Sequence, residues 1–195
     1  MKDLNLPTLI SLKTNDINAF IDFWQQFYAY NDNERFYSDN IKMATYTSYN
    51  IEMLYQWKNG TILSVSKRKS LQEKIINKLL IINELRNAHV VDLKSFHEEF
   101  TTVSAVWRIF LLHIIKPDSY PIYDQHVHRA YQYIFGLSPD NITTFIKDSD
   151  KIAFYHKEYL PFVNEIGISN RKKMDEAFFA FGQFLNTRNY KKMII

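Results

Sequence analysis

The stretch KPDSYPIYDQHVHRAY, residues 116–131, joins two apolar runs and contains two prolines followed by an aspartate and two histidines. Pro117 and Pro121 lack an amide donor and disfavour helical geometry in the residue before them. We therefore expect the helix that ends near Ile115 to stop at these prolines. Asp124 stands directly before a second helical pattern, where an aspartate is a preferred N-cap. The stretch predicts a helix, a turn and a second helix.

The second helical pattern continues to a glycine that is expected to end it. Its apolar residues recur at helical spacing: Val127, Ala130, Tyr131, Ile134 and Phe135. An aspartate at the start of such a helix has its anionic form favoured by the helix dipole and by backbone N–H donors. We therefore expect Asp124 to be ionised at neutral pH.

The order of elements over residues 101–136 resembles the helix-hairpin-helix DNA glycosylase superfamily, which includes endonuclease III and the 8-oxoguanine glycosylases. The resemblance lies in an apolar helix, a short proline-containing loop, the motif P-x-x-D-x-H-V-x-R-A that begins at Pro121, and a second helix. It implies an all-α, compact multi-helix fold of the glycosylase type. It also implies hydrolysis of the N-glycosidic bond of damaged or modified bases in double-stranded DNA, with Asp124 as the catalytic carboxylate.

The sequence departs from the family pattern at the hairpin that precedes this region. The family's hairpin is rich in glycine, whereas residues 97–105, HEEFTTVSA, contain none. Bifunctional members place a lysine where this chain has Val103 or Ser104, so a Schiff-base lyase is not expected. The alternative reading is a catalytically inactive helical module with the same fold that binds DNA or another protein.

Composition limits the remaining classes. The 195 residues carry a formal net charge of +3 and no cysteine, which excludes disulfides and cysteine-ligated metals. No apolar run reaches the roughly 18 residues of a membrane span, and the first residues lack the apolar core of a signal peptide. We expect a cytoplasmic protein without a cofactor. A chain of this length fits a single domain, 1–195, or two small lobes that meet near residues 101–136.

Capped apolar periodicities along most of the chain predict further helices and an all-α fold. A helix capped by Asn15 or Asp16 is expected from Ile17 onward. A helix is also predicted over residues 39–55, although Thr45, Tyr46, Thr47 and Tyr49 favour a strand. Residues 71–85 are predicted to form one long amphipathic helix. Shorter helices are predicted over residues 93–100, 138–146 and 152–165. A last helix is predicted to follow Asn170.

Basic and aromatic residues provide candidate DNA contacts. Phosphate contacts are expected from cationic side chains: Lys67, Arg68, Lys69, Lys116 and Arg129. An enzyme of this class must also extrude the target base and hold it against apolar or aromatic groups. The candidates for this base stacking are Trp57, Tyr120 and Tyr123.

The alternation of Asp124, His126 and His128 could suggest a metal site, since each residue type can ligate a divalent ion. Residues two apart on a helix point about 200° away from each other, so the two histidines cannot share an ion there. We therefore expect no metal. Asp124 and His128 are four residues apart on one face, and the sequence predicts that His128 acts with Asp124 as a catalytic pair. His113, in an apolar helix, is expected to be a buried histidine with satisfied hydrogen bonds.

Overall fold

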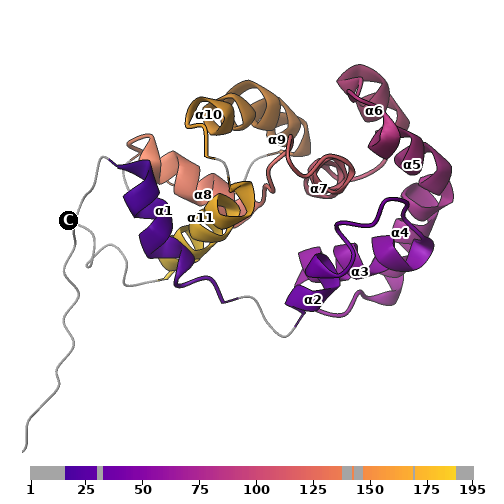
Figure 1. Cartoon of the computed structure of the whole chain (residues 1–195), viewed down its shortest axis with the longest axis horizontal. Coiled ribbons are helices and arrows are strands. Elements are labelled where there is room, and N and C mark those ends of the chain that lie inside the picture. Colours follow the sequence, from indigo (N-terminus) through magenta and orange to yellow (C-terminus); the bar gives the residue numbers. More distant parts are fainter. Residues whose placement is uncertain (1–15, 30–32, 138–141, 143–146, 169, 188–195) are drawn as a thin grey trace, which may run out of the picture. The chain divides into compact units, whose positions relative to one another are not determined.

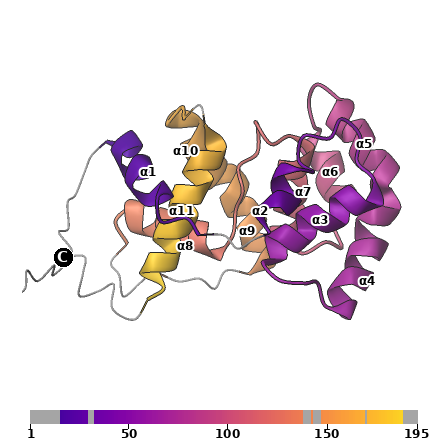
Figure 2. The ribbon, with the colours of Figure 1, turned by 60° about the horizontal axis from the view of Figure 1, so that its bottom comes forward.

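The structure is a computed structural model that describes residues 16–29, 33–137, 142, 147–168 and 170–187. Within these residues all the regular elements are helices and no strand occurs (Figures 1 and 2). The all-α class predicted from the sequence is confirmed. The helix predicted over residues 138–146 lies outside the described residues, apart from residue 142.

The chain forms two compact units, which we describe separately. Unit 1 comprises Met1–Tyr28, Gln125–Thr144 and Lys172–Ile195, and its described helices are α1 (Ile17–Gln25), α8 (Gln125–Ile134) and most of α11 (Arg171–Leu185). Unit 2 comprises Ala29–Asp124 and Phe145–Arg171. Its helices are α2 (Glu34–Ser38), α3 (Ser48–Asn59), α4 (Val65–Lys74), η1 (Ile76–Lys78), α5 (Leu79–Asn87), α6 (Leu93–Glu99), α7 (Ala105–Ile115), α9 (Asp148–Phe154), η2 (Tyr155–Tyr159) and α10 (Leu160–Glu165).

The core of unit 1 is built from aromatic rings and one glycine contact. Phe20 of α1 packs edge-on against Phe178 and Phe181 of α11, with ring centroids 5.8 and 5.2 Å apart. On α11, a Cβ added to Gly182 would lie 1.9 Å from the carbonyl oxygen of His126. The backbones of α8 and α11 therefore touch at Gly182, and the two helices cross closely in Figure 2.

Unit 2 is organised around α7, whose residues from Ile109 to Ile115 are all buried. The sequence predicted this because the helix is apolar on nearly every side. Arg86 of α5 fixes the end of α7: its guanidinium donates to the carbonyls of Ile114 (2.6 Å) and Ile41 (2.8 Å) and lies 4.3 Å from the Tyr46 ring. These contacts place the end of α7, and so the start of the loop that follows it.

Local sequence signals account for many helix ends. The side chains of Asp16 and Asp92 accept hydrogen bonds from the second helical residue of α1 and α6. Thr47 and Asn50 form a capping box at the start of α3, and Gly60, with φ 74°, ends that helix. Gly136 follows α8 with φ 81°, as predicted.

The helix expected over residues 39–55 is wrong in its first half. The chain turns through residues 39–47 and becomes helical only at Ser48. The turn is stabilised by long-range bonds: the Tyr46 hydroxyl donates to Ile114 O (2.8 Å), and Asn83 binds both the amide and the carbonyl of Tyr46. Tertiary contacts therefore override helical periodicity here.

Two expected continuous helices are interrupted. The predicted helix over 71–85 breaks at Ile75 (φ −128°, ψ −59°), where α4 gives way to η1 and then α5. The predicted helix over 152–165 contains a π-helical turn, η2, between α9 and α10. The first interruption has no glycine or proline near it. At the second, Pro161 stands two residues after η2, where it lacks the amide that would continue the helical bonding and disfavours regular helix around Lys157.

Candidate functional site

The loop of residues 116–124, called here the Asp124 loop, connects α7 to α8. The amides of Ser119 and Tyr120 both donate to Lys116 O at 3.0 Å, so the chain turns immediately after α7. Residues 121–124 are non-helical, and α8 begins at Gln125. The predicted order of a helix, a turn and a second helix is confirmed. Asp124 occupies the position directly before the first residue of α8.

His113 holds the Asp124 loop against α7. Its Nδ1 lies 2.7 Å from the carbonyl oxygen of Tyr120, and its Nε2 lies 2.7 Å from the hydroxyl of Tyr37. A carbonyl can only accept, so His113 carries its proton on Nδ1 and accepts from Tyr37 at Nε2. His113 is buried, and its predicted role as a satisfied core histidine is confirmed.

The carboxylate of Asp124 is paired with an amine that the sequence did not suggest. The Nζ of Lys58, near the end of α3, donates to Asp124 Oδ2 at 3.0 Å. The Lys58 side chain is 7% exposed and that of Asp124 is 16% exposed. Lys58 Nζ also lies 5.9 Å from the centroid of the Phe110 ring. Because water is largely excluded, this ion pair is stronger than a surface pair and its separation would cost more.

The π turn η2 supports the other end of the Asp124 loop. The hydroxyl of Tyr155 donates to Pro121 O at 2.9 Å. Tyr123 packs against Tyr155 and Tyr159, with ring centroids 5.9 and 5.8 Å apart. Burial, and secondarily the negative charge of Asp124, raise the pKa of the Tyr123 phenol above its usual range. Tyr123 is therefore a neutral, buried anchor of the loop.

The three residues predicted to stack on a base lie in or against the core of unit 2. Trp57 is 4% exposed, donates from Nε1 to Glu34 (2.9 Å) and packs on Tyr37 with ring centroids 4.5 Å apart. Tyr123 is buried as described, and Tyr120 is partly buried, which raises the pKa of its phenol. Tyr120 is the most accessible of the three, while stacking by the other two would require them to leave their present packing.

His128 and Arg129 belong to unit 1, whereas Asp124 closes a segment of unit 2. The Nε2 of His128 accepts from the amide of Gln132, one turn along α8, at 2.9 Å. Arg129 is buried and donates to Gly182 O (2.8 Å) and to Nδ1 of His126 (3.1 Å). Both side chains thus have structural partners within unit 1. Their roles in catalysis and phosphate binding stay predictions.

The remaining predicted phosphate contacts lie on two parts of unit 2. Lys116 donates to the carbonyls of Arg86 (2.7 Å) and Ala88 at the end of α5, so its ammonium caps that helix. Lys67, Arg68 and Lys69 lie in the first half of α4, whose N-cap is Ser64.

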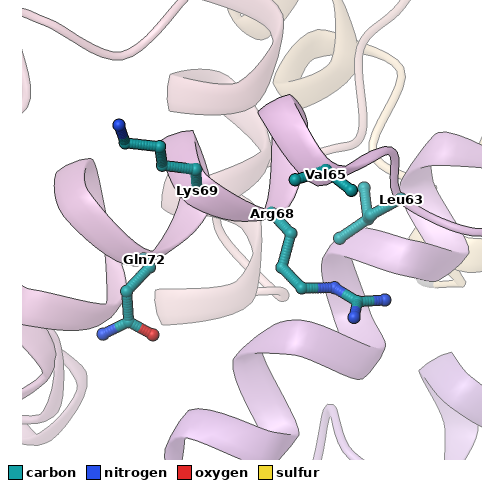
Figure 3. A pocket seen from close by; sticks show the side chains of 5 residues that line it. All are labelled: Leu63, Val65, Arg68, Lys69 and Gln72. Carbon is teal, nitrogen blue, oxygen red and sulfur yellow. The ribbon is translucent and has the colours of Figure 1, made fainter.

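Two basic residues of α4, Arg68 and Lys69, line an open hollow of about 530 Å³ together with Leu63, Val65 and Gln72. Figure 3 shows Arg68 extending beside Leu63 and Val65, while Lys69 and Gln72 project from the helix in other directions. Arg68 is paired with Glu52 at 3.2 Å, and Lys69 with Glu73 at 3.8 Å. Both cations remain more than half exposed and could exchange these carboxylates for phosphates.

The connection that corresponds to the glycine-rich hairpin of the resembled family is a five-residue turn between α6 and α7. Val103 is buried there, and its amide donates to Phe100 O at 3.0 Å. The amide of Ala105, the first residue of α7, donates to Asp148 Oδ2 at 3.1 Å. In the resembled family the backbone amides of this hairpin hold a DNA phosphate. Here the carboxylate of Asp148 accepts the hydrogen bond of one such amide, at the start of α7.

Lys58 is the residue that sequence reasoning missed. It stands in the Lys-Asn-Gly segment where α3 ends, and 66 residues separate it from Asp124. No spacing rule connects positions so far apart. The prediction that no lysine occupies the lyase position concerned Val103 and Ser104 alone, whereas Lys58 reaches Asp124 from another helix.

Among the described residues, no three histidine, aspartate or glutamate side chains come together as a group that could hold a metal ion. None of the described helices has the length and apolarity needed to cross a membrane. Comparison of the chain with known protein families, with curated proteins and with solved structures finds no match.

Proposed function

We propose that the protein is a DNA-binding enzyme that hydrolyses the N-glycosidic bond of damaged or modified bases, with Asp124 as its catalytic carboxylate. The observation that carries the proposal is the Lys58–Asp124 ion pair directly before α8, in a loop anchored by His113 and by Tyr155. A carboxylate fixed in this way is preorganised, and preorganised charge is the main source of electrostatic catalysis.

An ionised carboxylate serves N-glycosidic cleavage in two ways. It stabilises the positive charge that develops on the sugar as the base departs, and it orients or deprotonates the water that attacks. The ammonium of Lys58, 3.0 Å away, favours the ionised form of Asp124. Lys58 is thus a positioning residue in the proposed reaction, because it holds the carboxylate charged and in one orientation.

The proposed reaction uses water as the nucleophile. In the ion pair Lys58 is an ammonium without a lone pair, and Schiff-base formation requires a free amine. We therefore expect no covalent adduct when the protein and a lesion-containing duplex are treated with borohydride. A trapped adduct that disappears in Lys58→Met would show that the enzyme is a lyase with Lys58 as its nucleophile, and would contradict the hydrolytic mechanism.

The central test is Asp124→Asn, which keeps the size and the hydrogen-bonding oxygen of the side chain but removes its charge. Release of a base from a cleavable duplex is expected to fall by roughly 10²-fold or more, the scale on which one preorganised electrostatic group acts. DNA affinity should stay level or rise, because a negative charge leaves the phosphate-facing region. Single-turnover base release and a mobility assay measure the two quantities.

Glu176→Gln is the matched control, because it also neutralises a carboxylate that is paired with a lysine and 16% exposed, but it belongs to α11 and not to the basic helix α4. Its base release should equal that of the wild type. Circular dichroism must show that Asp124→Asn is folded at the assay temperature, since the variant leaves Lys58 with a weaker partner. Wild-type protein that leaves a broad panel of lesions intact, or a variant that cuts them equally well, would disprove catalysis by Asp124.

The second candidate is a DNA-binding module that has the fold without the chemistry. Two observations favour this module. The Ala105 amide already donates to Asp148, which leaves one donor fewer for a phosphate, and Trp57 and Tyr123 are packed in the protein, which leaves fewer rings for a flipped base. DNA binding without base release across the panel would establish this function in place of the first.

Both candidates require binding to DNA through the basic first half of α4. Lys67→Ala with Arg68→Ala should weaken binding by a similar factor for all sequences and should reduce the dependence of affinity on salt, as expected when about two phosphate contacts are lost. Mobility assays at several salt concentrations measure this. Lys94→Ala with Lys157→Ala removes equal charge elsewhere in unit 2 and serves as the control. Wild-type protein that does not bind duplex at low salt would exclude both candidates.

A further inference from the structure

Two histidines outside the Asp124 loop form a direct pair in unit 2. His97 lies on α6 and His156 on the π turn η2, and their Nε2 atoms are 2.8 Å apart. The rings meet almost perpendicularly, with an interplanar angle of 81°. The Nδ1 atoms of both rings are buried and have no hydrogen-bond partner among the described residues. The ring–ring hydrogen bond is therefore a direct polar contact between α6 and η2.

The number of protons decides whether this bond can exist. In the neutral pair, one ring donates its Nε2 proton to the lone pair of the other Nε2, and the second ring keeps its proton on Nδ1. One added proton still leaves a donor and an acceptor at the contact. Two added protons place two N–H groups against each other, so the doubly protonated pair has no bond and two like charges in contact.

Nearby charges make the doubly protonated pair still less favourable. Arg108 of α7 donates from Nη1 to His97 O at 3.2 Å, and its positive charge acts on both rings. The negative charge of Asp148, on α9, acts on Arg108. The Asp148 carboxylate is itself bound to Lys151 and to the Ala105 amide. The charge that acts on both rings is thus a cation, and the carboxylate that acts on this cation is already bound by other donors, so neither stabilises an imidazolium.

The histidine pair is connected to the Asp124 loop through η2. His156 directly follows Tyr155, whose hydroxyl binds Pro121 O and whose ring contacts Tyr123. Tyr159, at the end of the same π turn, packs on Tyr123 as well. The π turn stands just before Pro161, which interrupts the helical hydrogen bonds, and such turns are frequent at functional sites. Displacement of η2 from α6 would remove support from the residues just before Asp124.

We infer that the His97–His156 pair is an acid-operated latch. Its ring–ring bond holds η2 against α6 and so fixes residues 121–124 at neutral pH, and double protonation releases them. This inference does not rest on the proposed function, because the released element can be observed directly whether or not Asp124 cleaves a glycosidic bond.

The direction of the pH effect follows from burial. Burial, and then the charges of His156 and Arg108, lower the pKa of His97 from 6.5 to about 4; burial and Arg108 also lower the pKa of His156. Groups with lowered pKa values stay neutral until the solution is more acidic than pH 6.5. The latch is therefore closed at neutral pH and opens as the pH falls toward 4.

Nuclear magnetic resonance of the full chain tests the latch. Titration from pH 7.5 to 4 should show both imidazoles taking up protons below pH 6.5, accompanied by a shift of the Ile122 and Tyr123 amide resonances over the same interval. In His97→Gln with His156→Gln, whose amides can bond at the position of Nε2 without titrating, the acid shift of these amides should disappear. In His89→Gln, which removes an exposed histidine, it should remain.

Asp124 also titrates and lies next to Tyr123, so the titration is repeated in Asp124→Asn. A shift that persists there and is lost in the double glutamine variant supports the latch. The single variant His156→Gln provides the same comparison if the double variant does not fold. Imidazoles that titrate at 6.5, or amide shifts unchanged by the glutamine substitutions, would overturn the inference.

Discussion

Lys58 shows how a single residue can determine a site without any local signal. Its ammonium is largely buried with Asp124 as its partner, and the sequence places it in a helix-ending Lys-Asn-Gly segment. The pairing exists because α3 and the Asp124 loop both pack against α7, which no spacing pattern encodes. By contrast, Asp124, Gly60 and Gly136 were predictable, because each acts through the geometry of its own backbone neighbourhood.

Removal of Lys58 should therefore be costly. We expect Lys58→Met to lower the free energy of unfolding at pH 7 by about 3 kcal/mol, because it removes the ammonium that balances the Asp124 carboxylate in a mostly buried position. Lys69→Met is the control: its pair with Glu73 is exposed, and such pairs contribute roughly 0–1 kcal/mol. Urea unfolding measures both, and equal effects would show that the Lys58–Asp124 pair is effectively solvated.

At the scale of elements, the sequence predicts a helix where one face is apolar and a cap is present. It correctly placed α1, α6, α7, α8 and α11 in this way. It failed where distant residues decide the local geometry. Residues 39–47 turn because Tyr46 is bound by Asn83 and Ile114, and at η2 the contact of Tyr155 with Pro121 adds to the local effect of Pro161. These partners are 34 to 68 residues away, beyond any helical periodicity.

The crossing of α8 and α11 provides the element-scale prediction. Alanine normally stabilises a helix interior by about 1 kcal/mol relative to glycine. Gly182→Ala should do the opposite and destabilise the protein by roughly 1–3 kcal/mol, because its Cβ would meet the His126 carbonyl oxygen at 1.9 Å and backbone must move. Gln183→Ala, on the exposed side of the same helix, is the control. Thermal unfolding distinguishes the two; a raised melting temperature in Gly182→Ala would contradict the close crossing.

For the whole molecule, the division into units was the least predictable feature. Unit 1 draws on three segments of the chain, and one boundary falls between Asp124 and Gln125, at the start of a helix rather than in a linker. Domain boundaries are normally sought in flexible, polar stretches with few contacts. Here the boundary directly follows the Asp124 loop, and the sequence of that loop indicates a turn between two helices rather than a linker between domains.

Histidines and tyrosines of unit 2 together predict how the free energy of unfolding depends on pH. Between about pH 6.5 and 4 the unfolded chain protonates His97 and His156 while the folded chain keeps them neutral, because burial lowers the pKa of both. The unfolded state then binds more protons, so the free energy of unfolding should fall on acidification. At alkaline pH, burial raises the pKa of Tyr46 to about 12 and that of Tyr55 well above its usual range. Above about pH 10 the unfolded chain loses phenolic protons that the folded chain retains, and stability should fall again.

Stability should therefore be greatest between about pH 7 and 9, as measured by urea unfolding at a series of pH values. The glutamine substitutions at His97 and His156 should flatten the acid limb between pH 6.5 and 4 and leave the alkaline limb unchanged. Tyr46→Phe should flatten part of the alkaline limb only, although it also removes the hydroxyl bonds to Ile41 and Ile114 and so lowers stability at every pH. An acid limb that keeps its slope in the histidine variants would show that the histidine pair does not control acid stability. The slope would then have to come from other titrating groups. Asp148 is not among them, because its pKa is lowered chiefly by its hydrogen bond from Lys151 and its contribution is lost only below about pH 4.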